Sequence, residues 1–135
     1  MTVRRAESRD LPAMAELVSQ LGYPVDPKRL AARFERLPDS TTVFVTDDVS
    51  GLAALDIRQG LQQDAPRAQI VALVVDEAAR GRGVASALVG AIEDAARAAG
   101  CPQLTVVSGD HRPDAHAAYR ALGYAATGVR FRKEL

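Results

Sequence analysis

Two glycines and two arginines stand at the junction between a strand-like run and a helix-like run. Residues 80–85 read Arg-Gly-Arg-Gly-Val-Ala, after the apolar run at residues 70–75 and before a helical pattern that starts at Val84. Backbone N–H groups of a first helical turn have no partner within the helix, and the helix dipole adds partial positive charge there. Glycine lets a phosphate approach these donors, and Arg80 and Arg82 can add side-chain contacts. The stretch predicts a phosphate site, with a plain turn and solvated arginines as the alternative.

Two common phosphate-binding motifs fit this stretch less well. A P-loop requires a lysine directly after its last glycine, and Gly83 is followed by Val84. A dinucleotide-binding fingerprint would place its small residues at Gly81, Gly83 and Ser86, but that motif normally opens a larger fold near its first strand. Here the glycines lie past the midpoint of the chain. A nucleotide-binding or NAD-binding domain stays open as an alternative.

The segment LVVDEAARGRGVASALV, residues 73–89, resembles the acyl-coenzyme A (CoA) binding motif of the GNAT superfamily of N-acetyltransferases. That motif is written Q/R-x-x-G-x-G/A, and Arg80, Gly83 and Ala85 occupy its three fixed positions. A second segment at the expected distance, DAHAAYRALGY at residues 114–124, looks like the A-x-x-F-Y-x-x-x-G-F/Y segment that ends the family's core. The order of strands and helices also matches, so the resemblance covers essentially the whole chain.

The second segment would supply a catalytic residue. Tyr119, Gly123 and Tyr124 take the tyrosine, glycine and last aromatic positions, whereas Ala118 replaces the usual aromatic. By resemblance, Tyr119 is the general acid that protonates the departing thiolate. Spacing alone favours a core aromatic, because Tyr119 falls on the same helical face as Leu122. The resemblance instead favours the role of general acid for Tyr119.

The resemblance implies acetyl-CoA as cosubstrate and a site without a metal. Val74 and Val75, at the end of the fourth strand, would offer backbone groups to the pantetheine arm. The sheet would splay between this strand and the fifth strand at residues 104–108, and the thioester would lie in the gap. Arg112 would reach a CoA phosphate, or simply precede Pro113 at a helix start. The pyrophosphate would be held by Arg80, Gly81, Arg82, Gly83, Val84 and Ala85.

Acyl transfer to an amine needs a neutral amine, a stabilised oxyanion and a proton for the thiolate. A lysine-like amine has a pKa of about 10.4, so only around one in 2,500 is unprotonated at pH 7. The fourth strand carries no Glu or His, and Asp56, His111 and His116 are the polar possibilities elsewhere. None is assigned as the base. The backbone N–H of Val75 would hold the oxyanion without reorganisation.

Two loops would select the acceptor in this family. They correspond here to GYPVDPKR at residues 22–29 and QGLQQDAPR at residues 59–67. Tyr23, Asp26 and Asp64 are the residues there best able to meet an amine. Asp26 also precedes Pro27 at a helix start, so an N-cap role is favoured for it.

Composition narrows the class of protein. The chain has 135 residues, 17 basic and 17 acidic side chains, and one cysteine. No global field favours nucleic acid or an anionic membrane, and a single cysteine forms no intrachain disulfide. The charged N-terminus lacks an apolar run and no stretch is long enough to cross a bilayer, so a cytoplasmic protein is expected.

Hydrophobic patterning predicts one α/β domain (α+β) over residues 1–135. The order of strand-like and helix-like segments predicts a mixed central sheet flanked by about four helices. The resemblance implies a GNAT-like sheet of six to seven strands that splays between the fourth and fifth. Asp10 and Asp26 are the predicted N-caps of the first two helices. The predicted elements are a strand at 3–8, helices at 11–21 and 27–37, a hairpin at 41–58, a strand at 67–75, a helix at 84–99, a strand at 104–108, a helix at 112–122 and two short strands around Gly128.

The leading functional hypothesis is an N-acetyltransferase that acts on a primary amine of a small molecule or peptide through direct attack in a ternary complex. The alternative is a non-catalytic module that binds or senses acyl-CoA, in which Tyr119 is structural. By resemblance a homodimer is possible. No motif names the amine, the acyl chain or the oligomeric state.

Overall fold

The computed structural model of the protein describes residues 1–107 and 113–135. Within them, five strands form one sheet in the order β1-β2-β3-β4-β5. Strands β1 to β4 are antiparallel neighbours, whereas β5 runs parallel to β4, so the sheet is mixed as predicted. The strands are β1 (Val3–Arg5), β2 (Thr41–Thr46), β3 (Gly51–Arg58), β4 (Arg67–Val75) and β5 (Leu104–Val106).

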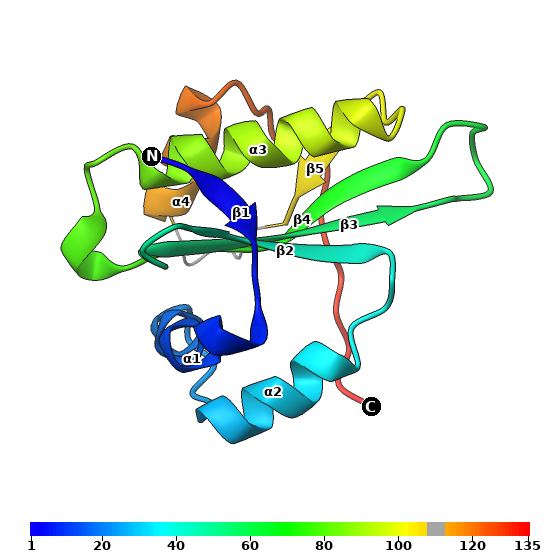
Figure 1. Ribbon diagram of the computed structural model, residues 1–135. Helices are drawn as coiled ribbons and strands as arrows, with labels where there is room; N and C mark the ends of the chain where they lie inside the picture. Colours follow the sequence, from blue (N-terminus) through cyan, green and yellow to red (C-terminus); the bar gives the residue numbers. More distant parts are fainter. Residues whose placement is uncertain (108–112) are drawn as a thin grey trace.

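The described helices cover both faces of the sheet. Figure 1 shows α3 along one face, and α1 and α2 along the other. None of the helices in the described ranges has the length and apolarity needed to cross a membrane. The prediction of about four helices is confirmed: α1 (Leu11–Gln20), α2 (Pro27–Glu35), α3 (Val84–Ala98) and α4 (Pro113–Ala121), with short 3₁₀ turns η1 (Ser8–Asp10) and η2 (Glu77–Ala79).

The two predicted N-caps behave differently. Asp26 accepts the backbone N–H of Arg29 at 2.8 Å, with Pro27 in the first turn of α2, so this cap is confirmed. Asp10 holds the N-cap position of α1, but its side chain makes no cap hydrogen bond there. Its carboxylate instead accepts two bonds from Arg4, at 2.8 and 2.9 Å, because a guanidinium fork offers two parallel donors. Asp10 therefore occupies the predicted N-cap position, but its side chain does not cap α1.

Each face of the sheet has its own apolar cluster. Leu88 and Ile92 of α3 are fully buried against Leu55 and Ile70, while Leu17 of α1 belongs to the cluster on the opposite face. Alternation along the strands sends successive side chains to the two clusters. The sheet is therefore covered by helices on both faces.

The partnership between β4 and β5 is short. Three consecutive residues of β4 pair with β5, ending at the pair Ile70–Val106. A register shift on the other edge leaves Val71 without a partner on β3. From residue 71 to residue 75, β4 has no neighbouring strand on the β5 side within the described chain. This is the position at which the sheet was expected to splay.

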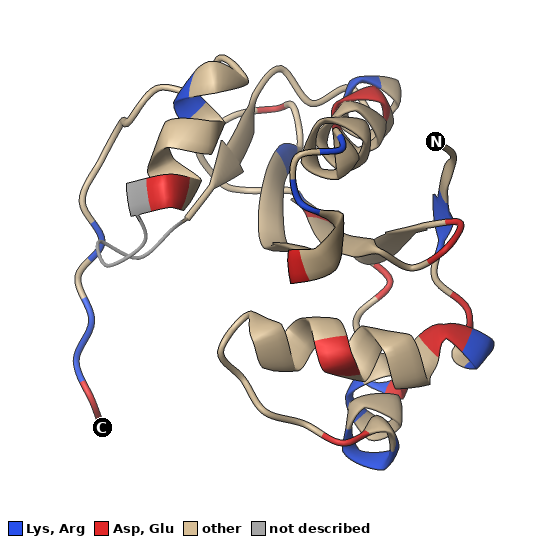
Figure 2. Ribbon diagram, turned by 90° about the vertical axis from the view of Figure 1, so that its left-hand side faces the viewer, with Lys and Arg blue, Asp and Glu red and all other residues tan. Residues whose placement is uncertain are grey.

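The predicted count of six to seven strands is wrong for the described residues. The segment after Gly123 carries local strand signals, yet residues 125–135 form no strand. A strand is stabilised only when its backbone groups find a partner edge. Figure 2 shows the C-terminal end of this segment clear of the sheet, so no ladder forms there.

Candidate active site

The loop between β4 and α3 owes its glycines to backbone conformation. Gly81 has φ = +80° and Gly83 has φ = +78°, a region that residues with a side chain adopt only with strain. A Cβ built at either position would meet no protein atom within 4 Å. The protein itself therefore leaves open space beside both glycines, and a side chain there would project into it.

The start of α3 presents unsatisfied backbone donors beside a cavity. Gly83 is the N-cap residue, and no side chain caps the helix. The cavity measures about 250 Å³. The β4–α3 loop that lines it is on the side toward the viewer in Figure 2. Free N–H groups and the helix dipole make this end of the helix favourable to an anion. The cavity is lined by Val75, Ala79, Arg80, Gly81, Gly83, Val84, Ala85 and Ser86.

Most of the residues predicted to bind the cofactor meet at this cavity. Arg82 and Val74 do not line it, and Arg112 lies outside the described residues. Ala79 and Ser86 also line the cavity, although the acyl-CoA motif does not include them. Ser86 follows the last motif position by one residue and belongs to the same first turn, which is the signal that identifies it.

Backbone direction distinguishes Val75 from Val74. Asp76 donates its N–H to the carbonyl oxygen of Ser50 at 2.8 Å, so its backbone groups point toward the β3 edge. Backbone groups of successive strand residues point to opposite edges. The N–H of Val75 therefore points toward the open side of β4, while that of Val74 points toward β3. Val74 is also buried in the cluster with α1. Val75 is thus the better placed of the two to offer a backbone donor.

Tyr119 lies on α4 and is half-buried. Its ring meets that of Tyr124 edge to face, with centroids 6.2 Å apart and planes at 66°. The Tyr124 hydroxyl donates to Glu93 Oε2 at 3.0 Å, and burial raises the pKa of Tyr124, as does this hydrogen bond. Tyr119 is not among the residues that line the cavity at α3.

A row of polar side chains crosses the sheet on the face that α1 packs against. Thr41, Asp56, Gln69 and Thr105 are successive cross-strand partners on β2, β3, β4 and β5. Asp56 shares its face with Leu52, which packs in the cluster with α1, because the two lie four residues apart on one strand. The row ends at Thr105, which is exposed on β5. Strand register, rather than any local motif, brings these residues together.

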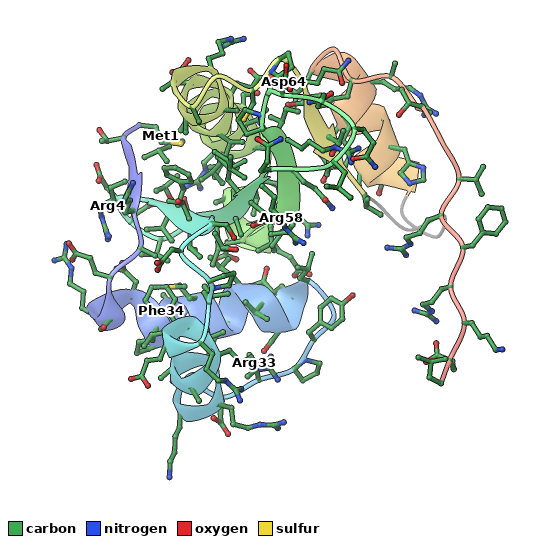
Figure 3. All side chains as sticks on the ribbon, turned by 90° about the vertical axis from the view of Figure 1, so that its right-hand side faces the viewer. Met1, Arg4, Arg33, Phe34, Arg58 and Asp64 are labelled. Atoms are coloured by element: carbon green, nitrogen blue, oxygen red, sulfur yellow. The ribbon has the colours of Figure 1, made fainter. Side chains whose placement is uncertain are left out.

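Asp56 is the buried member of this row. It is 4% exposed and accepts hydrogen bonds from Arg58 Nε and from Thr41 Oγ1, the latter at 3.2 Å. Burial alone would raise its pKa, but the bonds from Arg58, Ser40 and Thr41 outweigh burial and hold the pKa of Asp56 below its ordinary value. Figure 3 shows Arg58 between the sheet and the layer of α1 and α2. A carboxylate held in this way is a weak base and a good electrostatic partner.

Among the described residues, the others that the sequence predicted as base candidates or acceptor contacts do not line the cavity at α3. His116 is half-buried on α4, one turn before Tyr119, and His111 lies outside the described residues. Tyr23 is 66% exposed in the loop between α1 and α2, and Asp64 is exposed in the loop between β3 and β4. In the described residues no three His, Cys, Asp or Glu side chains gather as metal ligands.

Comparison with known proteins agrees with this architecture. The chain superposes on a protein from Agrobacterium tumefaciens described as an acetyltransferase, with a TM-score of 0.85, 27% identity and 100% of both chains covered. A Trypanosoma brucei acetyltransferase gives a TM-score of 0.81 at 25% identity, with 99% of both chains covered. The aminoglycoside 6′-N-acetyltransferase AAC(6′)-IG of Acinetobacter haemolyticus, at 21% identity, shares the fold, with a TM-score of 0.82 over 100% of this chain and 99% of that one.

No curated protein matches the chain in sequence. The family model of the GNAT acetyltransferases matches residues 9–124, which include the β4–α3 loop, the cavity and Tyr119. The chain therefore belongs to the GNAT acetyltransferase family.

Proposed function

We propose that this protein transfers the acetyl group of acetyl-CoA to a primary amine of a small molecule or peptide, by direct attack within a ternary complex. The observation that carries the proposal is the cavity at the start of α3, where uncapped N–H groups and two glycines with positive φ adjoin the open edge of β4. In a GNAT-family chain, these are the features that suit a CoA pyrophosphate and the arm that follows it.

The residues at this cavity fit the cosubstrate. Gly81 and Gly83 leave open space for phosphate oxygens to approach the backbone, and Arg80, whose side chain is exposed, can add a charge-assisted bond. Acetyl-CoA supplies the activated acyl group as a thioester. The N–H of Val75, which points toward the open edge of β4, would donate to the oxyanion that develops on the acyl oxygen.

The remaining roles would fall to side chains of α4 and of the sheet. Tyr119 would donate its phenolic proton to the leaving thiolate. The face that carries the polar row would receive the amine, with Asp56 as a fixed negative charge that favours a cationic acceptor. Since the low pKa of Asp56 makes it a poor proton acceptor, deprotonation of the amine would pass to water or to another group.

Thermal unfolding in the presence of acetyl-CoA, CoA or NAD tests cosubstrate binding. A ligand at 100 times its Kd adds about 2.7 kcal/mol of stability, which raises the midpoint by several degrees. We expect a rise with both CoA forms and none with NAD. In Gly83→Ala the rise should shrink, because a side chain at positive φ strains the N-cap and enters the phosphate space. A rise with NAD equal to that with CoA would favour a nucleotide-binding domain.

Release of free CoA with a panel of amines tests turnover. The panel should hold polyamines, amino acids, N-terminal peptides and aminoglycosides, the last because one protein of the same fold is an aminoglycoside 6′-N-acetyltransferase. We expect at least one amine to accelerate CoA release. Binding of CoA with no turnover across the panel would instead identify a non-catalytic acyl-CoA module.

A further inference from the structure

Arg58 is the last residue of β3, and its guanidinium is anchored at one nitrogen only. Nε donates to Oδ2 of Asp56, two residues earlier on the same strand, so both side chains lie on the face toward α1 (Figure 3). Asp56 is buried, whereas the side chain of Arg58 is 72% exposed. A guanidinium has five N–H donors, four of them on the two Nη atoms. Within the described residues, neither Nη atom of Arg58 makes a hydrogen bond or an ion pair.

Two other arginines of the chain show what distinguishes Arg58. Arg4 directs both Nη atoms at the buried Asp10, at 2.8 and 2.9 Å, so its terminal donors are used within the protein. Arg9 makes the same kind of contact as Arg58, with Nε bonded to Glu7 at 2.6 Å. The Glu7 carboxylate, however, is 57% exposed, so that pair lies at the surface. Arg58 combines a buried anchor with a fork of terminal donors that the described chain does not use.

The anchor of this fork is itself held by the sheet. Thr41 Oγ1 donates to Oδ1 of Asp56 at 3.2 Å across the β2–β3 pair, while Oδ2 receives Arg58. Burial opposes ionisation of Asp56, but the hydrogen bonds outweigh it and keep the pKa below its ordinary value. The carboxylate therefore stays charged at neutral pH and fixes the orientation of the guanidinium. A fork fixed in this way suits a carboxylate, which it can bind through two parallel N–H bonds.

A second cation faces Arg58 across the sheet. Arg67 is its direct partner on β4, so the two side chains share one face. Arg67 Nη1 donates to Gln62 at 3.5 Å, and Arg67 makes no ion pair within the described residues. Like charges directly opposite each other destabilise a strand pair. Two arginines and the single carboxylate of Asp56 leave an excess of positive charge here, and an anion bound between the strands would offset it.

We propose that Arg58 binds a carboxylate of the acceptor, so that the preferred acceptor is an amine that also carries an acid, as amino acids and short peptides do. This inference rests on the proposed function, in which this face of the sheet receives the amine. Asp56 stands opposite Gln69, and β4 loses its β5 neighbour after the next residue, Ile70. Strand residues rise about 3.3 Å each. The guanidinium bound to Asp56 is therefore within reach of a short substrate whose amine enters this opening.

Matched acceptors test this preference. Amino acids and tripeptides are each offered as the free acid and as the C-terminal amide, and kcat/KM for CoA release is measured with each. We expect Arg58→Gln to lower the ratio of acid to amide roughly 10- to 100-fold, mainly by raising KM for the acid. Each ratio is taken within one protein, so a loss of stability affects both acceptors alike. Arg58→Lys keeps the charge beside Asp56 but loses the fork, so it should lower the ratio by a smaller factor.

Arg9→Gln is the matched control for these variants. Arg9 has the same Nε contact with a carboxylate two residues earlier and is 71% exposed, but it lies on η1 outside the sheet. Its ratio of acid to amide should equal that of the natural protein. An unchanged ratio in both Arg58 variants, or an equal fall in Arg9→Gln, would overturn the inference and leave the proposed acetyl transfer intact. No release of CoA with any acceptor would overturn the proposed function, and the inference with it.

Discussion

Tyr119 and Tyr124 touch through their rings but are suited to different tasks. Tyr124 donates its hydroxyl proton to Glu93, and burial together with this bond raises its pKa, which makes it a weaker acid than an ordinary phenol. This hydrogen bond joins the residue shortly after α4 to Glu93 of α3, so it holds the end of α4 against α3. Tyr119 is the residue proposed here as the general acid, and its half-buried ring contacts that of Tyr124. The contributions of the two hydroxyls to catalysis can therefore be distinguished by single substitutions.

Replacement of Tyr119 by Phe removes the phenolic proton and keeps the ring. We expect kcat to fall by about 100-fold or more, because general-acid assistance typically contributes roughly 10²–10⁴. Binding of acetyl-CoA, followed as the thermal shift, should be unchanged. Tyr124→Phe is the matched control, since it loses a hydroxyl from the neighbouring ring at a cost of about 1 kcal/mol and should keep its kcat. Equal kcat values for Tyr119→Phe and the natural protein would remove Tyr119 as the acid.

At the level of elements, the position of the start of α3 depends on one glycine in β3. A Cβ at Gly51 would lie 2.6 Å from Val84 Cγ1 and 2.8 Å from Leu88 Cδ1. Val84 is the first residue of α3, is 2% exposed and has a stiff branched side chain. The absence of a side chain at residue 51 is what allows α3 to pack this closely on the sheet.

Gly51→Ala should therefore displace the N-terminal end of α3. We expect a loss of roughly 1–3 kcal/mol in the free energy of unfolding from overpacking, and a weaker Kd for CoA because the anion site moves with the helix. Gly90→Ala on the same helix is the control. A Cβ there meets no atom within 4 Å, so the change should be neutral or stabilising. Urea unfolding and calorimetric titration measure both quantities, and an unaffected Kd in a destabilised Gly51→Ala would contradict the coupling.

Local signals predicted the elements well where a few neighbouring residues decide the outcome. The Asp26-Pro27 helix start, the hairpin that ends in Arg58 and the glycine loop before α3 all depend on caps, β-branched runs and positive φ. The C-terminal strands were predicted wrongly because a strand forms only against a distant edge. The polar row through Asp56 was invisible for the same reason, since it depends on the register of four strands.

At the scale of the whole molecule, one buried ion pair joins the sheet to the helical layer beneath it. Arg4 lies on β1, while Asp10 ends η1 and leads into α1. The Asp10 carboxylate also accepts the backbone N–H of Glu7 at 2.7 Å, and its side chain is 4% exposed. The pair therefore holds the segment between β1 and α1 in one conformation. Removal of the Asp10 charge would weaken this connection between the sheet and the helix.

This junction predicts how stability depends on pH. The hydrogen bond from Arg4 lowers the pKa of Asp10 from 3.8 to about 2, against the opposing effect of burial, and the Glu7 N–H adds to the decrease. Because the folded pKa lies below the unfolded one, the contribution is fully present above about pH 4 and is lost as the pH falls toward 2. At 1.36 kcal/mol per pKa unit it amounts to about 2 kcal/mol.

Asp10→Asn should therefore lower the free energy of unfolding at pH 7 by about 2 kcal/mol or more, since it also leaves the Arg4 charge without its main partner. The difference from the natural protein should narrow as the pH falls from 4 to 2, because the natural carboxylate becomes neutral there too. Urea unfolding at a series of pH values measures both curves. Asp94→Asn, which changes a carboxylate 82% exposed on α3, should shift stability by no more than about 0.5 kcal/mol at any pH. Parallel curves for Asp10→Asn and the natural protein down to pH 2 would show that this ion pair does not govern acid unfolding.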